Sequence, residues 1–140
     1  MPETKKLSNV NEEVLEKPET SKKERLAGIL ERLSKTGDIE GSAIITRDGL
    51  LISSKLPENI DGETFAAMSA TMTGAAETAI QELKKSSPER VIVESKNAKL
   101  ITTGAGEQTI LACIVNPDAK LGLVLIEMKK ASAAIEKEAK

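Results

Sequence analysis

The stretch Ser42-Ala43-Ile44-Ile45-Thr46-Arg47-Asp48-Gly49-Leu50-Leu51-Ile52 decides the fold class, because it predicts a β-hairpin. Apolar and β-branched residues stand on both sides of an Asp-Gly pair. Such a pair favours a tight hairpin turn, since both residues tolerate positive φ. We therefore expect one strand over residues 42–47 and a second over residues 50–54.

Three further strands are predicted downstream of this hairpin. Residues 89–95 and 99–103 are separated by Lys96-Asn97, and Gly104-Ala105-Gly106 precedes a third apolar run over residues 108–115. Runs of this length between turn-forming residues are typical of strands. Short connections favour antiparallel neighbours, so the sheet is expected to be antiparallel.

Helices are predicted before, within and after these strands. Ser21 and Glu24 fit a capping box that begins a helix over residues 22–35. A long helix is expected over residues 62–86, with Asp61 as its cap.

The last predicted helix follows Asn116-Pro117-Asp118. Residues 121–128 could form a strand by composition, but a helix is favoured because apolar positions continue on one stripe. That stripe consists of Leu121, Leu125, Met128, Ala131 and Ile135.

The resulting order, α-β-β-α-β-β-β-α, predicts an α+β fold: a five-stranded antiparallel sheet with helices on both faces. It occupies a single domain over residues 21–138. Residues 1–20 are mostly polar and charged. They carry too little apolar surface to offset the entropy of ordering, so we expect a flexible tail, with a short docking segment as the alternative.

Composition argues against several classes of function. The chain has 140 residues, a formal net charge of -2 and 1% aromatic residues. Nucleic-acid binding normally requires a basic patch or aromatic stacking platforms, so it is not expected. No apolar run is long enough to span a membrane, and neither direct membrane insertion nor a signal region is predicted. A cytoplasmic protein is expected.

The usual catalytic groups are scarce. The chain has no histidine, and its one cysteine, Cys113, stands in the apolar run Leu111-Ala112-Cys113-Ile114-Val115, where an inert buried thiol is expected. Gly104-Ala105-Gly106 precedes a strand and lacks the further glycine of a dinucleotide-binding loop. No catalytic residue, cofactor-binding residue or metal ligand is assigned, and the protein is not expected to be an enzyme, although carboxylate catalysis stays formally open.

The helix over residues 62–86 is unusual because it has no charged residue between Glu63 and Glu77. We expect its apolar stripe to pack on the sheet; the stripe consists of Phe65, Met68, Met72, Ala76, Ala79 and Leu83. The opposite side, here called the small-residue face, consists of Ala67, Ala70, Thr71, Gly74 and Thr78. A glycine inside a helix costs roughly 1 kcal/mol relative to alanine, which suggests close packing against something. The two interpretations are a weakly polar exposed face and a two-fold dimer contact.

These segments resemble the roadblock / dynein light chain family. The hairpin over residues 42–52, the helix segment Ala66-Ala67-Met68-Ser69-Ala70 and the stretch over residues 116–124 carry the resemblance, which covers about residues 22–137. The resemblance implies one helix on one face of the sheet and two on the other. It also implies dimers in which the second helix and third strand of each copy meet and form a ten-stranded sheet.

The resemblance adds a strand to the expected dimer interface and suggests a function. The interface is then predicted to comprise Ala67, Ala70, Thr71, Gly74, Thr78, Arg90, Val91, Ile92 and Val93. The implied role is a non-catalytic adaptor or signalling scaffold that binds itself and a Ras-like small GTPase. The alternative is a domain that senses a small molecule. Surfaces left for a partner are the turn at residues 47–49 and the outer faces of the first and last helices.

Overall fold

The computed structural model contains a five-stranded antiparallel sheet with the spatial order β2-β1-β5-β4-β3. The structure describes residues 21–139, so the tail predicted over residues 1–20 lies outside the described residues. The strands are β1 (Ile39–Thr46), β2 (Leu51–Lys55), β3 (Arg90–Glu94), β4 (Lys99–Gly104) and β5 (Thr109–Val115). The most apolar run of the sequence is the central strand β5, which has neighbours on both sides and is buried along almost its whole length.

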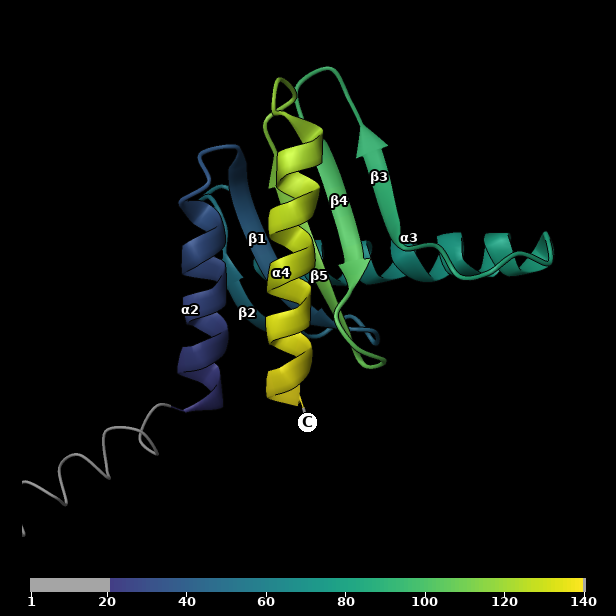
Figure 1. The fold of residues 1–140 in the computed structure, drawn as a ribbon, viewed down its shortest axis with the longest axis horizontal. Helices are drawn as coiled ribbons and strands as arrows, with labels where there is room; N and C mark the ends of the chain where they lie inside the picture. The colour runs from purple at the N-terminus through teal and green to yellow at the C-terminus, as the bar shows by residue number, and fades with distance from the viewer. Residues whose placement is uncertain (1–20, 140) are drawn as a thin grey trace, which may run out of the picture.

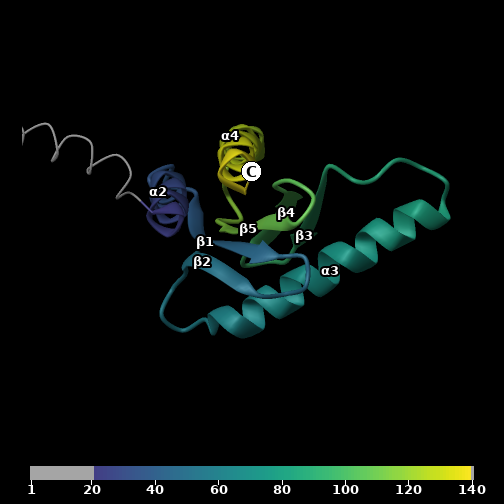
Figure 2. The same cartoon turned by 90° about the horizontal axis from the view of Figure 1, so that it is seen from below.

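Three helices cover the two faces of this sheet. They are α2 (Lys22–Ser34), α3 (Gly62–Glu82) and α4 (Leu121–Ala139). Helices α2 and α4 lie side by side on one face, and α3 lies alone across the other (Figures 1 and 2). The predicted fold class and element order are confirmed.

Each face of the sheet has its own core, and the two differ in size. The core between the sheet and helices α2 and α4 consists mostly of large side chains and includes Ile44, Ile101, Leu111 and Met128. The core between the sheet and α3 has fewer and smaller residues: Ala43, Ile45, Ala66, Ala70, Ile110 and Ala112, with Leu51 and Phe65 at the margin. Because these residues are small, α3 can lie close to the sheet.

The hairpin forms as expected, with two differences. Of the pair Asp48-Gly49, only Gly49 adopts positive φ (+93°), and the backbone N–H of Thr46 donates to the carbonyl of Leu50 at 2.8 Å. Strand β1 begins at Ile39 and not at Ser42, because Ile39 pairs with Val115 across a local irregularity in the register.

The helix ends also follow local chemistry. The Ser21 hydroxyl accepts a hydrogen bond from the Glu24 N–H at 3.1 Å, as the capping box predicts. Helix α3 ends at Glu82, four residues before the expected end at residue 86, because Lys84 takes a left-handed conformation (φ +61°). Residues 121–128 are helical, and Val124, Met128 and Ile135 bury the inner side of α4.

Candidate functional site

Helix α3 has two halves that differ in what they contact. Its buried residues, Ala66, Ser69, Ala70 and Thr73, all lie in the first half and pack on β1, β2 and β4. After Thr73 no residue of the helix is buried. The second half extends past the edge of the sheet beyond β3, as Figures 1 and 2 show. We call residues 74–82 the overhang.

An apolar cavity of about 260 Å³ lies on the α3 face of the sheet, beside the first turn of the helix. Its lining is Ile60, Phe65, Val93, Ser95, Ala98, Lys99, Leu100 and Ile114. Helix α3 crosses the sheet at the other end of β3, where Thr73 and Glu77 lie near Arg90 and Val91. The helix therefore leaves this apolar cavity uncovered within its own chain.

Strand β3 is an edge strand with an unusual surface. It pairs with β4 from Arg90↔Thr103 to Glu94↔Lys99, and no strand of the described residues lies on its other side. Ile92 and Val93 are 37% and 44% exposed. A free edge of this kind presents unpaired N–H and C=O groups to which another strand can bond.

The residues predicted for a dimer interface separate into four groups, of which the fourth is Ala70 alone. Arg90, Ile92 and Val93 are exposed on the free edge strand, and Val91 is half-buried there. Thr71, Gly74 and Thr78 are exposed on α3, and a Cβ added at Gly74 would meet no atom within 4 Å. Ala67 is half-buried against the turn at Gly49.

The expectation for Ala70 was wrong. Ala70 is 7% exposed and belongs to the core under α3, so it faces the sheet of its own chain. The apolar stripe was also expected to pack on the sheet, yet Met68 and Leu83 are 60% and 64% exposed. The helix is rotated by about one residue from the predicted orientation, because the smaller residues Ala66, Ser69 and Ala70 allow closer packing than Met or Leu. A rotation of one residue is about 100°.

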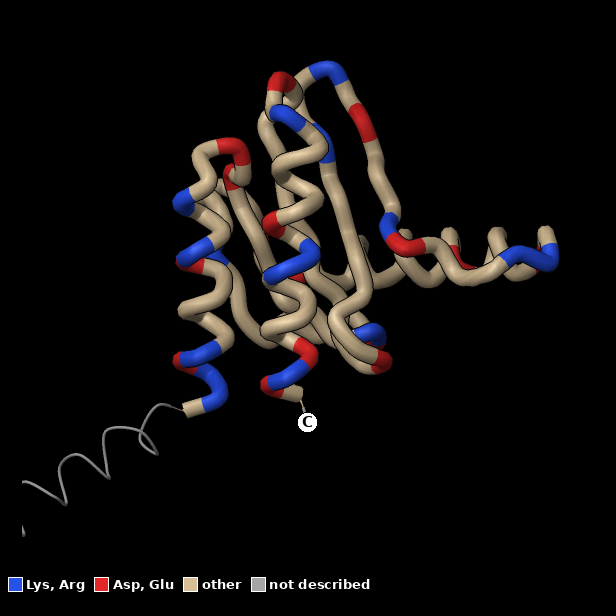
Figure 3. Tube along the Cα trace, viewed as in Figure 1, with Lys and Arg blue, Asp and Glu red and all other residues tan. Residues whose placement is uncertain are grey.

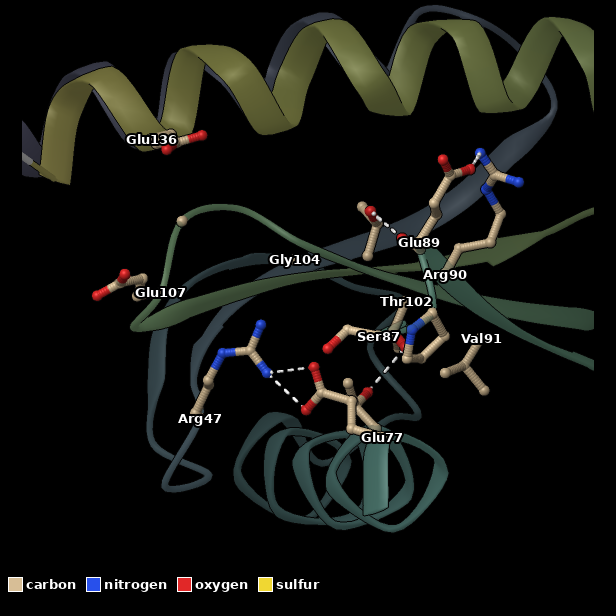
Figure 4. A pocket seen from close by; sticks show the side chains of 14 residues that line it. Arg47, Glu77, Ser87, Glu89, Arg90, Val91, Thr102, Gly104, Glu107 and Glu136 are labelled. Atoms are coloured by element: carbon tan, nitrogen blue, oxygen red, sulfur yellow. Dashed lines mark hydrogen bonds and ion pairs between the residues drawn. The ribbon is translucent and has the colours of Figure 1, made fainter. Parts of the chain in front are cut away.

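A second cavity of about 380 Å³ lies where α3, the β1–β2 turn and the β4–β5 turn converge (Figure 4). Here one guanidinium nitrogen of Arg47, Nη1, donates to both carboxylate oxygens of Glu77, at 2.7 and 2.8 Å. Gly104 allows this arrangement, because a Cβ at that position would lie 3.1 Å from Arg47 Nη2. The ion pair ties the hairpin turn to the first turn of the overhang.

A buried hydrogen bond supports the same crossing point. The hydroxyls of Thr73 on α3 and Thr102 on β4 lie 2.8 Å apart, and the Thr73 hydroxyl also lies 2.8 Å from the Ser69 carbonyl oxygen, to which it can donate. Sequence reasoning missed both this bond and the Arg47–Glu77 pair. Their members are 29 and 30 residues apart, and no local pattern links them.

Burial raises the pKa of Cys113 to about 12, so this thiol stays protonated at neutral pH and is a poor nucleophile. No group of three His, Cys, Asp or Glu side chains within residues 21–139 is placed to hold a metal ion. No helix in that range is long and apolar enough to cross a membrane.

A family model described as the Roadblock/LC7 domain matches residues 26–115. The chain belongs to the Roadblock/LC7 family. Three uncharacterised proteins of Methanocaldococcus jannaschii are each 36% identical to it over 108 residues, which is 77% of this chain and 91% or 94% of the relative. The predicted family resemblance is thereby confirmed.

Solved Roadblock/LC7 structures share the fold. Myxococcus xanthus MglB superposes with a TM-score of 0.77 at 25% identity, covering 82% of this chain and 87% of that one. The gliding protein MglB from Thermus thermophilus gives 0.78 at 23% identity, covering 85% and 91%. A Roadblock/LC7 domain from Streptomyces avermitilis gives 0.75 at 18% identity, covering 79% and 94%. At the identities of the last two, the likeness concerns the fold alone.

Proposed function

We propose that this Roadblock/LC7 chain is a homodimeric, non-catalytic regulator that binds a Ras-like small GTPase. The observation that carries the dimer is the overhang of α3 beside a free edge strand and an uncovered apolar cavity. The GTPase follows from the family resemblance. The lack of a reactive thiol and of a clustered metal site among the described residues supports a role in binding.

In a two-fold dimer, each chain can cover the apolar cavity and pair with the free edge strand of the other. In an antiparallel pairing of two β3 strands, the rotation exchanges the Arg90 end of β3 with the Glu94 end. Helix α3 crosses at the Arg90 end, and the apolar cavity lies at the Val93 end. The overhang of the partner's α3 therefore reaches the uncovered cavity, and both copies gain the same contact.

The apolar stripe is the side of α3 that meets the partner in this arrangement. Phe65 lines the cavity, and Met72, Ala76 and Leu83 follow it at 7, 11 and 18 residues on the same side of the helix. Met72 and Ala76 are half-buried and Leu83 is exposed. We therefore assign the helix contact to the apolar stripe rather than to the small-residue face.

The dimer is tested by light scattering over a dilution series of the full chain. We expect a dimer mass for the wild type. Ala76→Glu is expected to raise the dissociation constant at least about tenfold, because an unpaired carboxylate would be buried between the helices. The matched control is Thr78→Glu, on the small-residue face of the same overhang, which is expected to leave the dimer intact. A monomeric wild type, or equal effects of the two variants, would contradict the interface.

The regulatory role is tested with purified Ras-like GTPases of the same organism, loaded with GDP or with a non-hydrolysable GTP analogue. We expect binding that prefers one nucleotide state and a changed rate of GTP hydrolysis or nucleotide exchange. Both effects should weaken for Ala76→Glu at concentrations where it is monomeric. If the folded dimer binds none of these GTPases in either state, the regulatory proposal is wrong.

Small-molecule sensing is the second candidate, and one cavity favours it. About 390 Å³ of space lies between α4 and strands β3 and β4, on the two-helix face, with Ile101, Leu125 and Met128 among its lining residues. This volume falls within the range of ligand pockets, roughly 300–1,000 Å³. A thermal-shift screen of metabolites tests it. A stabilising compound whose effect is lost in Ala133→Lys, an exposed position of the lining, would support sensing. If the screen finds no such compound, the sensing candidate is wrong.

A further inference from the structure

Strand β3 carries opposite charges at its two ends, on the same face of the sheet. Arg90, Ile92 and Glu94 pair with Thr103, Ile101 and Lys99, respectively. Ile101 belongs to the core under α2 and α4, so these three β3 residues face that side of the sheet. Val91 and Val93 alternate with them and face α3.

We propose that this charge pattern selects a second copy of the same chain, in one register centred on Ile92, in which Arg90 of each copy lies opposite the partner's Glu94. This inference rests on the proposed dimer and adds its register and its specificity. The two-fold axis then produces two identical Arg–Glu pairs, with Ile92 against Ile92 between them. Directly opposed residues of antiparallel strands have Cβ atoms about 4.5–5.5 Å apart, close enough for side chains of opposite charge to interact.

Other registers lose this match. A shift of one residue would place α3-facing residues opposite residues that face α2 and α4, which a continuous sheet forbids. A shift of two residues centres the pairing on Val91 or on Val93. In both cases one of the two charged residues lies opposite the partner's Ile92, and the other lies opposite a residue outside the partner's β3. Centring on Ile92 is also the register that pairs all five residues of β3 (Arg90–Glu94).

Within one chain, Arg90 and Glu94 make only weak ion pairs, which do not compete strongly with the proposed pairs between copies. Arg90 lies 3.3 Å from its neighbour Glu89, whose side chain is 83% exposed. Glu94 lies 4.0 Å from Lys99, at the limit of an ion pair. Both contacts are at the surface, where an isolated ion pair contributes little. The Lys99–Glu94 contact can persist in the dimer and would extend each cross-copy pair into a row of three alternating charges.

The α3 face agrees with the same register. Centring on Ile92 places Val91 of one copy opposite Val93 of the other, so apolar residues meet on the side where the partner's overhang covers the cavity. The charged pairs lie on the opposite side, which α2 and α4 of each copy leave open at this edge. In this register the residues that face α3 form apolar pairs, and the charged residues on the other face form pairs of opposite charge.

Charge reversals test the proposal because their effects depend on which copies are mixed. Arg90→Glu alone and Glu94→Arg alone each place like charges opposite one another twice in the homodimer. Each is expected to raise the homodimer dissociation constant about tenfold or more, measured by analytical ultracentrifugation at low salt. An equimolar mixture of the two variants restores both attractive pairs, so a heterodimer is expected, identified by native mass spectrometry with one copy mass-labelled.

The double variant Arg90→Glu/Glu94→Arg gives the sharpest result. It is expected to form homodimers about as tightly as the wild type, yet to exclude the wild type from mixed dimers, since a mixed pair carries only like charges. Lys96→Glu, an exposed charge reversal in the β3–β4 turn, is the matched control and should leave self-association unchanged.

The outcomes separate this proposal from the dimer itself. If the wild type dimerises and the single reversals neither weaken it nor pair with each other, the register and the charge selection are wrong while the dimer stands. A monomeric wild type would overturn both. Circular dichroism confirms that each variant is folded, as expected for side chains that are 39% and 64% exposed.

Discussion

The two halves of α3 are both rich in alanine and differ in their surroundings. The first half buries Ala66, Ser69, Ala70 and Thr73 against the sheet, whereas no residue of the overhang is more than half-buried in its own chain. Neither half carries a charge between Glu63 and Glu77. Lack of charge therefore indicates a helix that is covered on more than one side. It does not indicate which side contacts the same chain and which side contacts a partner. Figure 3 shows charge along α2, along α4 and at the far end of α3.

The largest expected effect comes from placing a charge in the first half. Ala66 is fully buried. Ala66→Glu would bury an unpaired carboxylate in a small, tightly packed core, which we expect to cost about 4 kcal/mol or more and to abolish stable folding. Urea unfolding followed by circular dichroism measures the loss.

The matched control is Ala75→Glu in the overhang, where the alanine is exposed. This variant should change the free energy of unfolding by less than about 0.5 kcal/mol. Equal losses for the two alanines would mean that the two halves of α3 do not differ as the structure shows.

The next effect concerns the hydrogen bond at the boundary between the halves. Thr73→Val leaves the buried Thr102 hydroxyl without its partner, which is expected to cost about 1–3 kcal/mol. Thr73→Val/Thr102→Val removes both polar groups and should be closer to the wild type than Thr73→Val alone. A double variant that loses the sum of the two single effects would show that the hydroxyls do not act as a pair.

Sequence alone was sufficient for the elements and insufficient for the orientation of α3. Hairpin, caps and strands follow local rules, and α2, β1–β5 and α4 appear close to their expected positions. The prediction of which side of α3 faces the sheet was wrong, because it placed the largest apolar residues in the core, where such residues usually lie. Here the sheet beneath the helix presents Ala43 and Ala112, and this close packing selects small residues from the helix as well.

The ion pair between Arg47 and Glu77 could not be predicted from a local sequence pattern either. Arg47 stands in the hairpin turn, where an exposed charge is ordinary, and Glu77 ends the uncharged stretch of α3. Only the fold brings them together, over a glycine that leaves room for the guanidinium. Long-range contacts of this kind depend on how α3 crosses the sheet, which periodicity within one helix does not encode.

This ion pair gives a smaller expected effect. Both side chains are partly shielded, with 32% and 25% of their surface exposed. Glu77→Gln should cost about 1 kcal/mol, after allowance for solvent screening. Part of that loss should disappear in 1 M salt, where the Debye length is about 3 Å. A variant as stable as the wild type at low salt would show that the pair does not hold the hairpin turn to α3.

The smallest expected effect tests whether the small-residue face or the apolar stripe of α3 contacts the partner. Gly74 lies in the overhang with open space around it. Gly74→Ala should therefore stabilise the helix by about 0.5–1 kcal/mol, because alanine loses less backbone entropy on folding. Its dimer dissociation constant should stay unchanged if the apolar stripe makes the helix contact, as we propose. If Gly74→Ala instead weakens the dimer while raising the stability of the monomer, then close packing at the small-residue face, and not the apolar stripe, joins the two copies.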